Sequence, residues 1–185
     1  MQLHAAAGGR DGVGILLPAP SKSGKSTLTA ALARERFEIV SDELVTLNVG
    51  ECRVFGGRPF IHLRPDTLSL FPELAGRKLE PGTEQLVVHT VDDLGGTIVD
   101  SLVIQHLVFP QYVPGHLDSL MPIQRADALV ELCKNTIAFS SQGVQALCAL
   151  AVFVRQVECW RLTFSDLDRA VALITELVDN TAVLR

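Results

Sequence analysis

The chain of 185 residues lacks several features that would place it in a familiar class. No apolar run approaches the ~20 residues that cross a bilayer, so no membrane partner is expected. The first residues, Met1 to Ala5, lack the charged-then-apolar plan of a signal peptide. There is no basic stripe and the formal net charge is −5, which argues against nucleic acid as a partner. These absences predict a cytoplasmic protein with a single domain over residues 1–185.

Cysteine pairs are also missing. The four cysteines are scattered with no Cys-x-x-Cys spacing, which predicts reduced, mostly buried thiols and no metal site built on them. The chain contains no internal repeat, no low-complexity segment and no Asn-Lys-x-Asp motif of the kind that reads guanine. A GTPase or motor-type NTPase therefore ranks third among the functional hypotheses, with Asp100 as its candidate Walker B residue.

One segment carries most of the chemical information, and it is Pro20-Ser21-Lys22-Ser23-Gly24-Lys25-Ser26-Thr27. An apolar run at residues 14–17 precedes it and a helical pattern follows it, which is the strand–loop–helix context of a phosphate-binding loop. Backbone N–H groups and the positive end of the helix would face phosphate oxygens. Lys25 is expected on the β- and γ-phosphates, and the Ser26 hydroxyl is expected on Mg²⁺.

The loop departs from the usual G-x-x-x-x-G-K-[ST] pattern at two positions. Ala19 stands where the first glycine is expected, and Lys22 stands where many such loops have another glycine. An alanine followed by Pro20 is held to extended conformations, and a lysine at positive φ is strained. Two interpretations stay open: the loop has lost phosphate affinity, or Lys22 adds a second cation beside the phosphates.

Apolar periodicity predicts an α/β fold in which a mixed sheet carries helices on both sides. A small antiparallel meander is expected after the loop and its helix, and Pro110 is expected to end a strand and begin a loop. The second apolar helix of the later half should be buried, and Ser165 to Asp168 resembles a capping box. Strands are predicted at 13–17, 37–40, 43–49, 53–55, 60–63, 86–89, 102–109 and 161–164, and helices at 25–36, 68–74, 126–133, 144–154 and from 165 onward.

An acidic pair, Asp42-Glu43, follows the predicted strand at residues 37–40. Ligand sites in open α/β sheets gather at the carboxyl ends of strands, so Asp42 is expected beside the loop as the acidic group that phosphoryl transfer requires. Glu43 is the weaker candidate, because the next strand could turn its side chain away. His62 and His106 lie in strand segments without metal-ligand spacing and are interpreted as structural.

Taken together, these residues resemble the C-terminal catalytic domain of the HPr kinase/phosphorylase family and its looser relatives. The match runs from Leu3 to Leu47, through Leu3-His4-Ala5, the strand and loop, and Ile39-Val40-Ser41-Asp42-Glu43. The resemblance implies an ATP- and Mg²⁺-dependent kinase in which Asp42 is the general base and His4 lies near the reacting phosphoryl group. Ser21 to Thr27 would hold the nucleotide phosphates, with Ser26, Asp42 and Glu43 near the metal.

Two hypotheses follow. The first is a kinase that phosphorylates a serine-like hydroxyl of a protein, peptide or small molecule. The second is a catalytically weakened nucleotide- or phosphate-binding module that works through protein contacts, favoured by Ala19, Lys22 and the absence of the family's metal-facing glutamate from residues 56–63. Arg64 and Arg58 are candidates for a substrate-contacting arginine. The apolar later helices could support a homo-oligomer, and burial within one subunit explains them equally well.

Overall fold

The computed structural model describes residues 1–21, 23–57, 61–75, 86–88 and 91–183. Within these ranges the main sheet has nine strands, and β6 and β7 form a separate pair. The strands are β1 (Gln2–Arg10), β2 (Val13–Pro18), β3 (Glu38–Ser41), β4 (Leu44–Asn48), β5 (Arg53–Gly56), β6 (Ile61–Leu63), β7 (Leu86–Val88), β8 (Thr97–Ile98), β9 (Ser101–Tyr112), β10 (Ser119–Pro122) and β11 (Glu158–Phe164).

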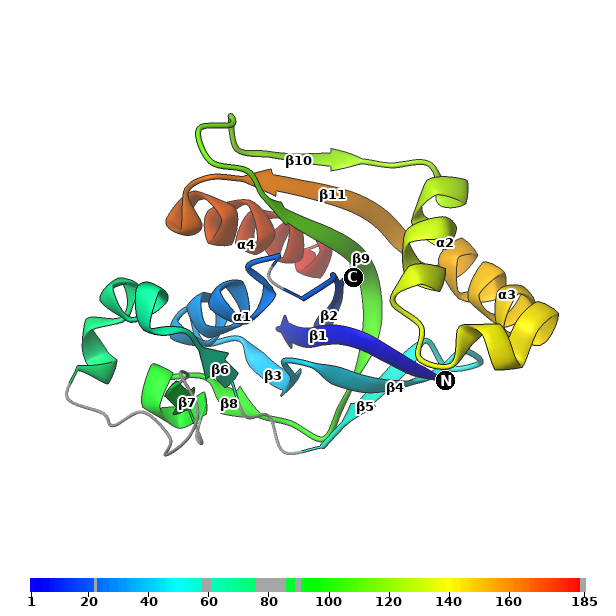
Figure 1. Cartoon of the computed structure of the whole chain (residues 1–185), viewed down its shortest axis with the longest axis horizontal. Helices are drawn as coiled ribbons and strands as arrows, with labels where there is room; N and C mark the ends of the chain where they lie inside the picture. The colour runs from blue at the N-terminus through cyan, green and yellow to red at the C-terminus, as the bar shows by residue number, and fades with distance from the viewer. Residues whose placement is uncertain (22, 58–60, 76–85, 89–90, 184–185) are drawn as a thin grey trace.

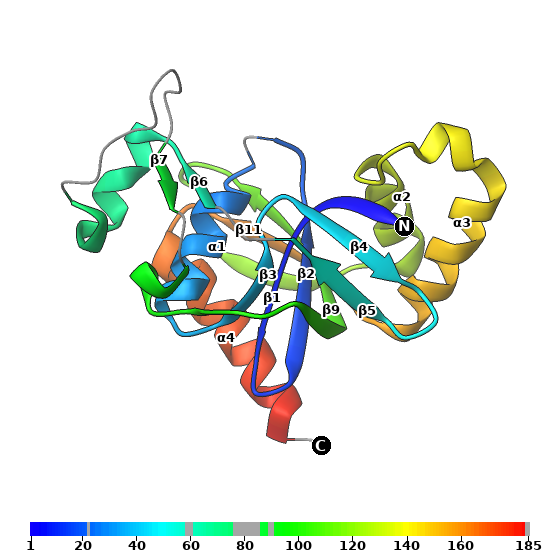
Figure 2. The ribbon, with the colours of Figure 1, turned by 90° about the horizontal axis from the view of Figure 1, so that it is seen from below.

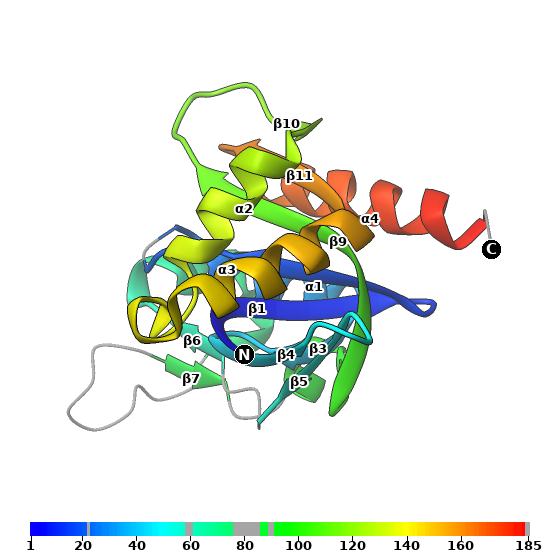
Figure 3. The same cartoon turned by 90° about the vertical axis from the view of Figure 1, so that its right-hand side faces the viewer.

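The helices cover both faces of this sheet, as the sequence predicts (Figures 1 and 3). One buried cluster joins the sheet to α1 and α4, and a second joins its other face to α2 and α3. The expected fold class, a mixed α/β sheet flanked by helices, is therefore confirmed. The helices are α1 (Lys25–Arg34), α2 (Arg125–Lys134), α3 (Phe139–Gln156) and α4 (Leu167–Val183), with short 3₁₀ turns η1 (Pro65–Leu70), η2 (Pro72–Leu74) and η3 (Val91–Leu94).

The sheet is mixed because the long strands β1 and β9 each pair with different strands along different parts of their length. β1 pairs antiparallel with β2 and β3 along most of its length and with β4 at its start. β9 pairs antiparallel with β5 at its start and parallel with β2 and β11 further on. The circuit β9–β5–β4–β1–β2–β9 therefore closes on itself; Figure 1 shows the curvature of β9, and Figure 2 shows β1, β2, β4 and β5 from below.

Strand direction fixes where a site can form. β2 and β3 both run antiparallel to β1 and hence parallel to each other, and β9 and β11 run parallel to β2. The carboxyl ends of all four strands consequently lie at one edge of the sheet, the edge at which ligand sites of α/β proteins gather.

Several local predictions are wrong. β9 runs through Pro110 to Tyr112, because at Pro110 it pairs with β11 alone, and a proline is tolerated where one side of a strand is unpaired. β6 leaves the expected meander to pair with β7. The sequence also did not predict β10 or the full length of β1. The Ala5-Ala6-Ala7-Gly8-Gly9 run of β1 has low β propensity.

Two helix predictions also need correction. α3 is not fully buried: Val144 is 74% exposed and Val152 49%, whereas Leu150 and Phe153 on the opposite face are buried. The cap of α4 is shifted by one residue, since the Asp166 carboxylate accepts the Arg169 N–H at 2.8 Å. No helix in the described part of the chain is long and apolar enough to span a bilayer.

Candidate functional site

The strand–loop–helix unit forms as the sequence predicts. β2 ends at Pro18, and α1 begins at Lys25 with Gly24 as its N-cap. Gly24 has φ 88°, a left-handed conformation that glycine adopts without strain. Its carbonyl accepts the N–H of Leu28 at 2.9 Å, which starts the helix. The loop therefore leads directly into a helix N-terminus, where backbone N–H groups and the helix dipole favour an anion.

A cavity of about 360 Å³ opens at this helix end. We call it the Asp42 cavity. It collects residues from β1, the loop, α1, the turn after β3, and β6 with the residue that follows it. Its lining residues are His4, Pro20, Ser21, Gly24, Lys25, Ser26, Thr27, Asp42, Glu43, His62 and Arg64.

The predicted site residues are thus brought together from distant parts of the chain. His4, Lys25, Ser26, Asp42 and Glu43 all line the Asp42 cavity. Of the remaining predicted loop positions, Ser21, Gly24 and Thr27 line it too, Ser23 lines a neighbouring cavity, and Lys22 lies outside the described residues.

Two buried ionisable side chains face each other here. Lys25 is 6% exposed and Asp42 is 2% exposed. The Lys25 ammonium donates a hydrogen bond of 2.6 Å to the backbone carbonyl of Asp42, so the lysine is held at the end of β3. The Asp42 carboxylate is not used in this bond; it accepts hydrogen bonds from the Ser26 and Thr29 side chains and from the His62 backbone.

Burial controls the protonation of both groups. It raises the pKa of Asp42 above its ordinary value, while the nearby Lys25 charge opposes that rise. It lowers the pKa of Lys25, against the opposing effect of Asp42 and Glu43. Removing either charge from water is unfavourable unless a partner compensates, and each of these two groups partly compensates the other.

Hydrogen bonding at the Asp42 carboxylate is incomplete. Among the described residues, the buried side-chain atoms without a hydrogen-bond partner are Asp42 Oδ1, Ser23 Oγ and Thr175 Oγ1. Two of these three belong to the loop and to the acidic pair. Buried polar atoms are nearly always satisfied in folded proteins, and the exceptions call for a functional explanation such as a ligand or an ion.

The turn after β3 is held by Ser41. The Ser41 hydroxyl accepts the backbone N–H groups of Glu43 at 3.3 Å and Leu44 at 3.2 Å. This turn leaves Glu43 exposed on the cavity wall, with its carbonyl accepting the Ala5 N–H at 3.0 Å. His4 is fixed by its own backbone, whose N–H donates to the Asn135 carbonyl at 2.7 Å.

His62 is the site residue that sequence reasoning missed. It was interpreted as structural, yet it lines the Asp42 cavity together with Arg64, which had been only a candidate for substrate contact. Ile61 and Leu63 are fully buried, so strand alternation turns His62 to the other face of β6. That alternation was visible in the sequence; the missing information was that β6 returns to the loop.

The residues present fit a magnesium ion held mainly by phosphate and water. In the described ranges no group of three or more His, Cys, Asp or Glu side chains is arranged as a metal site. The Ser26 hydroxyl and the unpartnered Asp42 Oδ1 are oxygen ligands of the kind Mg²⁺ takes, and Mg²⁺ commonly keeps waters and binds through one or two carboxylates plus substrate phosphates.

The fold and the site define a mixed α/β protein with a strand–loop–helix motif and a buried lysine–aspartate pair at its mouth. No family model matches the chain, and no curated protein matches it in sequence. One solved structure to which it is similar is the HPr(Ser) kinase/phosphatase from Coxiella burnetii, with 16% identity and a TM-score of 0.49. The alignment covers 99% of this chain and 97% of that one.

Proposed function

We propose that the protein is an ATP- and Mg²⁺-dependent kinase that transfers phosphate to a serine-like hydroxyl of a protein, peptide or small molecule. The observation that carries the proposal is the Asp42 carboxylate. It is buried, one of its oxygens lacks a partner among the described residues, and it shares a cavity with Lys25 and Ser26. Those are the three parts that phosphoryl transfer to a hydroxyl needs: a base, a phosphate-binding cation and a metal-binding hydroxyl.

The residues of the Asp42 cavity divide the proposed reaction between them, and Asp42 takes part in it twice. The helix N-terminus and Lys25 bind the β- and γ-phosphates, and Ser26 and Asp42 would hold Mg²⁺, which neutralises phosphate charge when bound. Asp42 accepts the proton of the acceptor hydroxyl. The hydroxyl oxygen forms its bond to the γ-phosphorus as the bond to the β–γ bridging oxygen breaks, which leaves ADP. Burial raises the pKa of Asp42, and a stronger base suits this task.

Binding is tested first. Calorimetry with ATP, with and without Mg²⁺, should show metal-dependent binding by the wild type and at least a tenfold loss in Lys25→Ala. Lys134→Ala is the matched control, since Lys134 is an exposed lysine paired with Glu131. Absence of binding at millimolar ATP would overturn the proposal.

Transfer is tested next, by following ADP release with serine, serine peptides and small alcohols as acceptors. A kinase loses transfer in Asp42→Asn while retaining ATP binding. The second candidate, a binding module without catalysis, predicts ATP binding and no Asp42-dependent transfer with any acceptor. It is favoured by the Lys25 ammonium, because one of its three N–H donors is already bound to the Asp42 backbone carbonyl.

A further inference from the structure

A second cavity adjoins the loop on the side away from Asp42, and we call it the Gln111 cavity. Its volume is about 380 Å³, within the range of small-molecule sites. Pro20 and Ser21 line both cavities, so the loop forms a shared wall between them. We propose that the Gln111 cavity binds the nucleoside part of the phosphate donor; the inference rests on the proposed function.

The order of the strands sets the direction of the donor. β2, which leads into the loop, lies between β1 and β9. Beyond β1 comes β3, whose carboxyl end carries Asp42; on the opposite side come β9 and β11. A γ-phosphate lying between Lys25 and Asp42 therefore occupies the β3 side of the loop. The rest of the nucleotide then extends toward the carboxyl ends of β9 and β11.

The sheet supplies one wall of the Gln111 cavity. Phe109 pairs with Arg161 and Gln111 pairs with Thr163 in the parallel register of β9 and β11. Alternation along a strand places residues 109 and 111 on one face, and their partners share it. Phe109, Gln111 and Arg161 all line the cavity, so one apolar ring and two hydrogen-bonding side chains stand on the same wall.

Helix α2 supplies the opposite wall. Glu131 and Asn135, near its C-terminal end, line the Gln111 cavity, and Figure 3 shows α2 lying over the face of the sheet that carries β9 and β11. Asn135 is 8% exposed, and its side-chain amide donates to the Glu131 carbonyl at 2.9 Å, which fixes that turn. An apolar surface with a few fixed polar groups is the usual lining of a small-molecule site.

An incomplete hydrogen bond points to a ligand in the same place. Ser23 lines the Gln111 cavity, and its Oγ is buried without a hydrogen-bond partner among the residues the structure describes. A ribose hydroxyl or an α-phosphate oxygen passing the loop would supply that partner. The two unpartnered atoms beside the loop are thus divided between the cavities, with Asp42 Oδ1 at the first and Ser23 Oγ at the second.

The test compares ATP with inorganic tripolyphosphate, which carries the phosphates without the nucleoside. By calorimetry in Mg²⁺, the wild type should bind ATP at least about tenfold more tightly, a difference of about 1.4 kcal/mol. Gln111→Trp fills the cavity from an exposed position, and it should remove this preference while leaving tripolyphosphate binding unchanged. Leu117→Trp is the matched control, because Leu117 is 86% exposed and does not line the cavity.

Arg161→Ala is a second variant, which shortens a side chain of the cavity wall instead of filling the cavity. It should weaken ATP binding by about tenfold without affecting tripolyphosphate binding. Equal wild-type affinity for the two ligands would overturn the inference and leave the phosphate site standing. Retention of the ATP preference in both Gln111→Trp and Arg161→Ala would also overturn it. If neither ligand binds, the proposed function fails together with the inference.

Discussion

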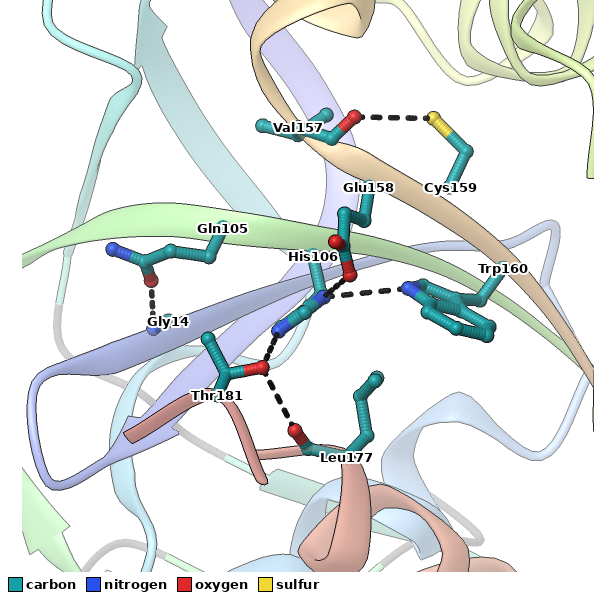
Figure 4. A network of polar contacts seen from close by, with 9 residues as sticks. All are labelled: Gly14, Gln105, His106, Val157, Glu158, Cys159, Trp160, Leu177 and Thr181. Atoms are coloured by element: carbon teal, nitrogen blue, oxygen red, sulfur yellow. Dashed lines mark hydrogen bonds and ion pairs between the residues drawn. The ribbon is translucent and has the colours of Figure 1, made fainter. Parts of the chain in front are cut away.

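Two buried polar clusters in this protein differ in how well they are satisfied. His106 is 1% exposed, and both of its ring nitrogens have partners (Figure 4). Trp160 Nε1 lies 3.3 Å from His106 Nδ1, and Thr181 Oγ1 lies 2.9 Å from Nε2. Asp42 is buried as deeply, yet one carboxylate oxygen has no partner among the described residues.

Three neighbours surround the His106 ring. The Thr181 hydroxyl donates to the Leu177 carbonyl at 2.9 Å, and its oxygen lies 2.9 Å from His106 Nε2. His106 Nδ1 lies 3.3 Å from the Trp160 Nε1–H group and 3.4 Å from the Glu158 carboxylate. A cluster with this closed pattern stabilises β9, β11 and α4 against one another. An open pattern, as at Asp42, is unfavourable for the protein alone and becomes favourable when a ligand completes it.

The largest effect expected from this contrast is on catalysis. Asp42→Asn should lower phosphoryl transfer by about a hundredfold or more, because an amide cannot accept the acceptor proton. It should not lower the free energy of unfolding, because the burial of the Asp42 carboxylate outweighs the compensating effect of the Lys25 charge, and an amide avoids that cost. ADP-release assays and denaturant unfolding measure the two quantities, with the exposed Asp11→Asn as control. A large loss of stability together with activity would place Asp42 in the same class as His106.

The opposite result is expected at the satisfied cluster. His106→Ala should reduce the free energy of unfolding by about 2–3 kcal/mol, because it leaves a cavity and removes a partner of the half-buried Trp160 N–H. ATP affinity of the folded protein should not change. His116→Ala, at an exposed histidine, should stay within about 0.5 kcal/mol of wild type. A His106→Ala protein with full stability and reduced ATP affinity would contradict the assignment.

A smaller change isolates one hydrogen bond of the cluster. Trp160→Phe keeps an aromatic ring and removes the N–H that His106 Nδ1 accepts. Stability should fall by about 1 kcal/mol, the usual net contribution of a single hydrogen bond. Thermal unfolding of this variant beside His106→Ala gives the comparison. No loss of stability in Trp160→Phe would mean that the ring packing, and not the hydrogen bond, is what Trp160 contributes.

The smallest expected effect is on how the free energy of unfolding depends on pH. Because burial raises the pKa of Asp42 in the folded protein, the folded state holds this proton more tightly than the unfolded chain. The stabilising contribution of protonated Asp42 is therefore present below its ordinary pKa and is lost as pH rises through the raised value. The unfolding free energy of wild type relative to Asp42→Asn should decrease as the pH rises above the ordinary carboxyl pKa of about 4. A difference that is flat or increases with pH would contradict the direction of the shift.

The sequence was informative where chemistry and periodicity coincide. Gly24, Lys25 and Asp42 could be placed because a strand–loop–helix order dictates their positions, and alternation of apolar residues located most strands. The wrong predictions concern residues whose structure depends on a segment that is distant in the sequence. Pro110 continues a strand because β11 arrives beside it, and His62 faces the site because β6 pairs with β7 and not with the meander.

Helix faces were harder to predict for the same reason. Val144 and Leu150 are equally apolar, and only the packing of α3 against the sheet leaves one exposed and buries the other. The shift of the α4 cap from Ser165 to Asp166 also depends on a residue that is distant in the sequence. Asp118 accepts the backbone N–H of Ser165 at 2.6 Å and that of Asp166 at 3.2 Å, which leaves the Asp166 side chain to cap Arg169.

The pairing of β2 with β9 has a consequence for synthesis of the protein. Gly14 pairs with Ile104, so the strand that leads into the phosphate-binding loop acquires its second neighbour only after more than half of the chain has been made. A nascent chain on the ribosome can form the hairpin of β1 and β2 and still expose the other edge of β2. The loop at the centre of the site is therefore anchored late, and edge protection by a chaperone would matter most during that interval.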